Sequence, residues 1–198
     1  MSRPAPQPIL GTRRDAVRNY HAVLAAARDV LGESGADASM EEIAARAGVG
    51  VGTLYRHFAS KDALIDELLR LALEEILAST DRALARTDGY GLEEFLRALG
   101  QSFADHARYA NLFLQRRTDD ATVYRMRAAL DELTARAITA GTVNPGTTPG
   151  DILALVWGMR GLVQAAGEVA PGEVAPAAWP RFLDIHLAGL RADRGEPS

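Results

Sequence analysis

Apolar residues recur at intervals of three and four along most of the chain, which is the period of an α-helix with one buried face. Near the N-terminus this spacing is followed by Val17, Tyr20, Leu24, Ala27 and Leu31. No segment alternates apolar and polar residues in the period of a strand. The pattern predicts an all-α chain with helices near 12–34, 39–48, 51–58, 61–86, 91–107, 109–117, 119–140, 149–167 and 178–192.

Residues that begin and end helices lie at the expected places in the first part of the chain. Ser39 and Glu42 form the S-x-x-E pattern of a capping box, in which each side chain satisfies the free backbone N–H of the other residue. Gly35 and Gly48 follow the first and second predicted helices, where glycine adopts a left-handed backbone at no steric cost. Two helices are therefore expected before residue 48, the second of about two turns.

Charge and composition limit the classes of protein that fit. Residues 1–61 carry eight basic and six acidic side chains, whereas the remainder carries fourteen and twenty, in a chain of net charge −4. This asymmetry fits an anionic partner near the N-terminus, and it equally fits a solvated basic arm. Cysteine is absent, no run of about 18 apolar residues occurs, and the first residues lack a secretory signal. We expect a cytoplasmic protein with no membrane partner.

The segment "AGVGVGTLYRHFASKDAL", residues 47–64, contains the densest set of functional candidates. Two short helices joined by a glycine-containing turn form a helix-turn-helix, which places its second helix in the major groove of DNA. The same pattern also occurs where helices merely pack together. For DNA binding, Leu54 and Phe58 would hold the second helix in place, and Lys61 would suit a phosphate at the start of the next helix. The outward face would offer Val51, Thr53, Arg56 and His57.

The longer segment "SMEEIAARAGVGVGTLYRHFASKDALIDELL" resembles the N-terminal DNA-binding domain of the TetR family of bacterial transcriptional regulators. The resemblance covers roughly residues 13–70, and it fades beyond them. It implies that Thr53 and Tyr55 face the DNA, with Tyr55 reaching a phosphate, although a half-buried aromatic would also fit there. It further implies that Val51 and Arg56 approach bases or flanking phosphates and that Lys61 holds a phosphate. The complete set of expected DNA-binding residues is Ser39, Val51, Thr53, Tyr55, Arg56, His57 and Lys61.

One residue departs from the pattern of this family. Gly50 stands where the family commonly has a serine or threonine that caps the recognition helix. Glycine at that position costs only a few tenths of a kcal/mol in helix stability, so the fold is expected to survive the loss of a hydroxyl. With this unit assigned, we expect a flexible segment at 1–11, a helix-turn-helix domain at 12–60, and a helical ligand-binding and dimerisation domain at 61–198.

The plan of the TetR family implies a two-fold dimer and an internal pocket in each subunit. A stripe of small and apolar residues on the last two predicted helices suits the dimer interface, namely Gly158, Gly161, Leu162, Ala165, Phe182 and Ile185. The same stripe would arise from burial within one subunit. The expected ligand-binding residues are Phe103, His106, Phe113, Met126, Trp157, Arg160 and Gln164. Each of them could instead be an ordinary core residue, and Arg160 could form an ion pair across the dimer.

The function expected from these features is that of a dimeric, ligand-responsive transcriptional regulator. By the family resemblance it is a repressor, released from palindromic operator DNA by an unidentified small molecule. No metal site, cofactor or catalytic site is expected, because the four histidines lie far apart and no catalytic motif is present. Two alternatives remain, an all-α interaction protein that has lost sequence-specific DNA binding and a small helical enzyme.

Overall fold

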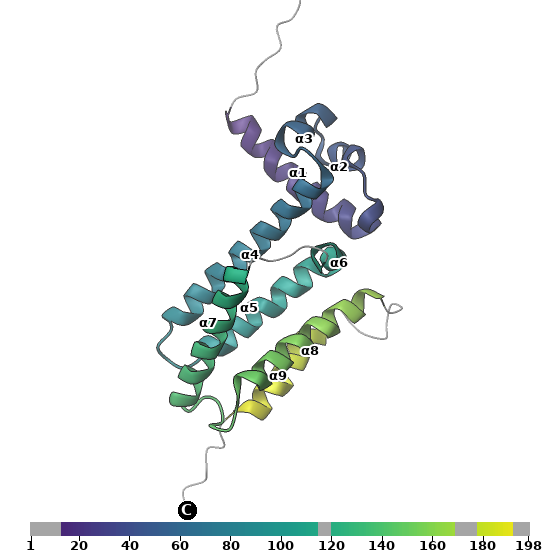
Figure 1. Cartoon of the computed structure of the whole chain (residues 1–198). Helices are drawn as coiled ribbons and strands as arrows, with labels where there is room; N and C mark the ends of the chain where they lie inside the picture. The colour runs from purple at the N-terminus through teal and green to yellow at the C-terminus, as the bar shows by residue number, and fades with distance from the viewer. Residues whose placement is uncertain (1–12, 115–119, 169–177, 192–198) are drawn as a thin grey trace, which may run out of the picture. The chain divides into compact units, whose positions relative to one another are not determined.

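The computed structural model describes residues 13–114, 120–168 and 178–191, which form nine α-helices, two short 3-10 turns and no strand (Figure 1). The predicted all-α class is confirmed. The helices are α1 (Arg13–Ser34), α2 (Met40–Ala47), α3 (Val51–His57), α4 (Lys61–Ala85), α5 (Gly91–His106), α6 (Ala110–Leu114), α7 (Asp120–Thr139), α8 (Pro149–Glu168) and α9 (Ala178–Leu190). The 3-10 turns are η1 (Gly35–Asp37) and η2 (Ala107–Tyr109).

The helices follow the predicted segments closely, with ends that differ by one or two residues where both are described. The flexible segment predicted at 1–11 lies outside the described residues, as do residues 115–117 of the helix predicted at 109–117. One predicted buried position is wrong, because Val17 of α1 is 52% exposed. None of the helices in the described ranges is long and apolar enough to cross a membrane.

The chain divides into two compact units, which end and begin at Leu68 and Leu69 within α4. The boundary predicted between residues 60 and 61 lies at the start of the same helix. In the first unit α2 packs against both α1 and α3. The residues buried there include Val23, Leu24, Ala27, Leu31, Ile43, Leu54, Phe58, Leu64 and Leu68.

The ends of α2 show why this short helix is stable. The backbone N–H of Ser39 donates to Glu42 Oε2 at 2.9 Å, and the N–H of Glu42 donates to Ser39 Oγ at 3.2 Å, which is the predicted capping box. The backbone N–H of Ser39 and the Ser39 hydroxyl, which donates to the same carboxylate, hold the pKa of the Glu42 carboxyl below its usual value. Gly48 ends the helix with a φ of 68°, and its N–H donates to the carbonyls of Ala44 and Ala45. The last carbonyls of α2 are therefore hydrogen-bonded where the chain turns toward α3.

The second unit has a hydrophobic core of its own. Helix α5 packs against α7, α8 and α9, and α8 packs along α9 (Figure 1). The buried core of this unit is mainly apolar, with Phe95, Leu96, Leu133, Ile152, Met159 and Leu183 each almost fully buried.

Gly100 allows α5 to approach α8 and α9 closely. A Cβ atom added at Gly100 would lie 2.5 Å from two ring carbons of Trp179 and 2.7 Å from the sulfur of Met159. Trp179 and Met159 are both buried, so neither has solvent to move into. The packing of the three helices at this point therefore requires a residue without a side chain.

We expect Gly100→Ala to destabilise the chain by about 1–3 kcal/mol, because the added methyl group forces the packed ring and sulfur apart. Urea unfolding followed by circular dichroism measures the change. Gly189→Ala is the control, since a Cβ there meets no described atom within 4 Å. The control should stay within about 0.5 kcal/mol of the parent chain. Equal stability of the two variants would contradict the close approach at Gly100.

Candidate nucleic-acid interface and ligand cavity

Helix α3 is held in place by two buried apolar side chains. Leu54 is fully buried, and Phe58, which follows the helix, is 5% exposed and stacks on Tyr20 at 5.8 Å between ring centroids. The hydroxyl of Tyr20 in turn donates to Glu67 of α4. At the N-terminus, the carbonyl of Gly50 accepts the N–H groups of Thr53 and Leu54, with no side-chain cap. The helix is thus anchored by its inner face.

The opposite face of α3 is open. Tyr55 is 45% exposed and Val51 36% exposed, and Gly52 and Arg56 are exposed as well. Thr53 is half-buried. His57 is also half-buried, because its ring leans on those of Tyr20 and Phe58 at centroid distances of 6.2 and 6.3 Å. Of the residues predicted to contact DNA, Val51, Tyr55 and Arg56 present the most accessible surface.

Two other candidates are engaged by their own unit. The hydroxyl of Ser39 donates to Glu42 Oε2 at 2.9 Å, so the capping box uses this side chain as well as its backbone. The ammonium of Lys61 donates to the carbonyls of Ala36 at 2.5 Å and Ala38 at 3.0 Å. Lys61 therefore ties the start of α4 to the segment between α1 and α2. One of its three N–H groups remains for another acceptor.

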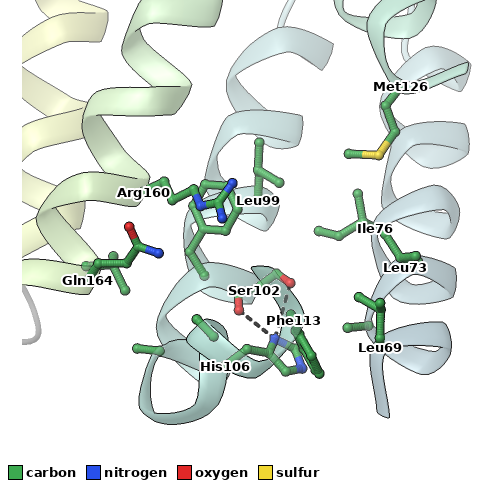
Figure 2. A pocket seen from close by; sticks show the side chains of 15 residues that line it. Leu69, Leu73, Ile76, Leu99, Ser102, His106, Phe113, Met126, Arg160 and Gln164 are labelled. Atoms are coloured by element: carbon green, nitrogen blue, oxygen red, sulfur yellow. Dashed lines mark hydrogen bonds between the residues drawn. The ribbon is translucent and has the colours of Figure 1, made fainter. Parts of the chain in front are cut away.

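The second unit contains a cavity of about 310 Å³ (Figure 2). One wall is α4, which contributes Leu69, Ala72, Leu73 and Ile76. Helix α8 supplies Arg160, Val163 and Gln164, and α7 supplies Met126. The remaining lining comes from α5, η2 and α6, with Leu99, Ser102, Phe103, His106, Ala107, Ala110 and Phe113. The lining is mostly apolar, with a few polar groups, which is the usual composition of a small-molecule site.

His106 lies at one end of this cavity and is only 8% exposed. Its Nδ1 is 2.6 Å from the backbone carbonyl oxygen of Ser102 and 3.4 Å from the Ser102 hydroxyl, and Figure 2 draws both contacts. A carbonyl oxygen only accepts, so Nδ1 is the donor in this contact, and in the tautomer that this implies Nε2 is an acceptor. The ring packs edge-on against Tyr109 at 5.7 Å and lies 5.9 Å from the ring of Phe113. These contacts fix its orientation.

A second cavity of about 400 Å³ adjoins the first. The two share Leu73, Leu99, Phe103, Met126 and Arg160 as lining. The second adds Arg127 and Asp131 of α7 and Trp157 of α8, among others. The guanidinium of Arg160 lies over the Trp157 ring, 5.4 Å from its centroid. All seven residues expected to bind a ligand thus line one or both cavities, and ligand binding by them stays a prediction.

Comparisons with known proteins agree with this architecture. Residues 23–68 match the family described as bacterial regulatory proteins, tetR family. The TetR transcription regulatory protein from Mycobacterium vanbaalenii is 30% identical, and the match covers 91% of this chain and 99% of that one with a TM-score of 0.59. The chain belongs to the TetR family. SCO0520, a TetR transcriptional regulator from Streptomyces coelicolor, is 28% identical over 87% of this chain and 98% of that one, with a TM-score of 0.63.

Sequence relatives cover less of this TetR-family chain. The HTH-type transcriptional regulator SAR0097 of Staphylococcus aureus is 32% identical over 96 residues, which are 47% of this chain and 50% of that protein. UidR of Escherichia coli is 43% identical over 65 residues, 32% of this chain and 30% of that protein. The match thus spans half or less of these relatives. They are named as transcriptional regulators, not enzymes.

The residues expected at a TetR-type dimer interface divide into two groups. The missing Cβ of Gly158 would lie 3.0 Å from Cζ of Phe182, so these two residues pack α8 on α9 within one chain. Gly161 has no described atom within 4 Å of its Cβ position, and Ile185 is 59% exposed. Leu162 and Ala165 are half-buried. The structure contains one chain, and the interface stays a prediction.

Sequence reasoning missed the contribution of α4 to the cavity. Leu69, Leu73 and Ile76 recur at intervals of three and four, which marks an apolar face. That spacing was available in the sequence, but it does not say whether the face meets a packed core or an open space. The sequence therefore indicates an apolar face on this helix, but it does not indicate that the face lines a cavity.

We expect Lys61→Met to lower the free energy of unfolding by about 1 kcal/mol, because two charge-assisted hydrogen bonds to backbone carbonyls are lost. Arg56→Met is the control, since Arg56 is exposed and on the outer face of α3. Thermal and urea unfolding of both variants, without DNA, measure the difference. A Lys61→Met chain as stable as the control would show that the tie to Ala36 and Ala38 contributes nothing.

Proposed function

We propose that this TetR-family chain is a DNA-binding transcriptional regulator that reads the major groove with α3. The observation that carries the proposal is the division of α3 into two faces. Leu54 and Phe58 are buried, while Val51, Tyr55 and Arg56 are exposed on a helix held by a capped α2 and a tight turn. Arg56 offers donors to bases or phosphates, and Tyr55 offers a hydroxyl to a phosphate.

We further propose that the chain acts as a two-fold dimer through α8 and α9. Trp157 on α8 is 58% exposed and Ile185 on α9 is 59% exposed, and Gly161 leaves space for another helix to approach. Large exposed apolar side chains on adjacent helices favour a protein interface. A dimer also suits a helix-turn-helix, because two half-sites lie about 34–36 Å apart on DNA. A palindromic operator would match this symmetry.

A small molecule bound in the cavity would release the DNA. The cavity wall on α4, with Leu69, Ala72, Leu73 and Ile76, is continuous in the chain with the first two turns of α4, which belong to the DNA-binding unit. A ligand that binds one conformation of the chain more tightly shifts the equilibrium toward it. A coupling of about 1–3 kcal/mol changes DNA affinity by roughly 5–150-fold. We therefore propose a repressor that its ligand releases.

Fluorescence anisotropy on labelled DNA from immediately upstream of the protein's own gene tests this function. At about 0.15 M salt, with excess unrelated duplex, we expect tight binding with two chains per site. Lys61→Ala and Arg56→Ala should each flatten the slope of log affinity against log salt by about one unit, if each contacts one phosphate. Gly52→Ala, which adds only a methyl group, serves as the control for the slope.

If the excess unrelated duplex abolishes binding to the labelled DNA, the result would favour the other candidate, an all-α interaction protein without sequence-specific DNA binding. An unchanged slope for Lys61→Ala, together with a loss of stability, would leave Lys61 with a structural role only. The stability measurement without DNA separates these two contributions.

A second variant tests the role of the cavity. Ala72 lines the cavity from α4 and is 7% exposed, so Ala72→Phe should fill part of the space that a ligand would occupy. We expect this variant to bind operator DNA with parental affinity and to resist release by cell extracts that release the parent chain. Ala78→Phe, at an exposed position two turns along α4, is the matched control. Normal release of the Ala72→Phe chain would place the responsive site elsewhere.

A further inference from the structure

We propose that the releasing ligand is an apolar molecule with a single carboxylate, and that Arg160 binds the carboxylate while the apolar body lies along α4. This inference rests on the ligand-responsive cavity proposed above, and it adds the chemical class of the ligand. Its basis is the charge of the lining, the position of Arg160, and the polar groups beside it.

The charge of the lining is positive in a chain whose net charge is −4. Among the residues of the described ranges 13–114, 120–168 and 178–191 that line the first cavity, Arg160 is the only arginine or lysine, and no aspartate or glutamate is present. The second cavity contains Arg127 and Asp131 besides Arg160. An anion entering the first cavity therefore meets a cation without facing a carboxylate. A cationic ligand would instead meet the like charge of Arg160.

Arg160 differs in its partners from several arginines of the second unit. Arg86, Arg97, Arg125 and Arg136 each form an ion pair with an aspartate or glutamate. Within the described ranges, the Arg160 guanidinium makes a cation–π contact with the ring of Trp157. Arg160 is half-buried, and a partly desolvated guanidinium gains most from an anion that accepts two parallel hydrogen bonds.

The side chains around Arg160 define how such a molecule would lie. Arg160 and Gln164 are one turn apart on α8, and both direct their polar ends toward the cavity (Figure 2). Leu69, Leu73 and Ile76 of α4 line the other side. A carboxylate at Arg160 would have the Gln164 amide as a second donor, and the apolar part would contact α4. A phosphate monoester carries a charge near −2, for which one guanidinium is a poor match.

A carboxylate of the partner subunit is the competing source of the anion, because Arg160 also lies next to the exposed Trp157. The two sources predict different results when Arg160 loses its charge. If the partner supplies the anion, the dimer weakens and the ligand preference is unchanged. If the ligand supplies it, the preference for a carboxylate disappears and the dimer is retained.

The test uses the full chain without DNA and three probes that differ only in their head group: decanoic acid, decanol and decylamine. Isothermal titration calorimetry at neutral pH measures each affinity. We expect decanoate to bind about tenfold or more tighter than decanol, the contribution of a charge-assisted hydrogen-bonded pair, and decylamine to bind weakest. Arg160→Met should reduce the decanoate affinity to that of decanol. Arg127→Met is the matched control, because Arg127 lines only the second cavity.

Equal affinities for decanoate and decanol, or a preference that persists in Arg160→Met, would overturn the proposal. Light scattering of both variants shows whether the dimer depends on Arg160. A loss of dimer with an unchanged preference would assign the anion to the partner subunit. Since no DNA is present, a failure here is distinct from a failure to bind the operator, which anisotropy detects by itself.

Discussion

The close packing at Gly100 is the constraint on which the second unit depends. The ring of Trp179 and the sulfur of Met159 occupy the space where a side chain of residue 100 would lie, so α5 sits directly against α8 and α9. Leu99, Phe103 and His106 lie on the same helix and line the cavity. Their distance from Arg160 and Gln164 on α8 is therefore set by a contact that lies in the core, away from the polar groups themselves. A well-packed core thus fixes the dimensions of the cavity beside it.

The local features of the fold could be predicted from the sequence because their physical causes are local. The bond between Ser39 and Glu42 spans three residues, and the left-handed turn at Gly48 depends on one residue. The all-α class and the positions of the helices follow from apolar spacing, which the chain shows clearly. The resemblance to the TetR family added the roles of the α3 residues, which spacing alone would not assign. In these respects the first unit is more predictable than the second.

The remaining features arise from contacts between distant segments. The bonds from Lys61 to Ala36 and Ala38 join residues more than twenty positions apart, and a sequence pattern does not show them. His57 leans on Tyr20 for the same kind of reason. The cavity is an absence of packing between α4, α5 and α8, and apolar spacing looks the same whether a face is packed or open. Arg160 stands out only when its neighbours are known.

The bonds of Lys61 also bear on the chain's choice of basic residues. Lysine occurs once in 198 residues, and arginine supplies all other basic side chains. The carbonyls of Ala36 and Ala38 both accept from the one nitrogen of Lys61, an arrangement that suits a compact ammonium with its three donors on one atom better than a planar fork of donors. The chain uses arginine rather than lysine at every basic position except 61, where the local geometry suits lysine. Exchange of lysine for arginine is neutral at many surface sites, but at the start of α4 it would disturb these two hydrogen bonds.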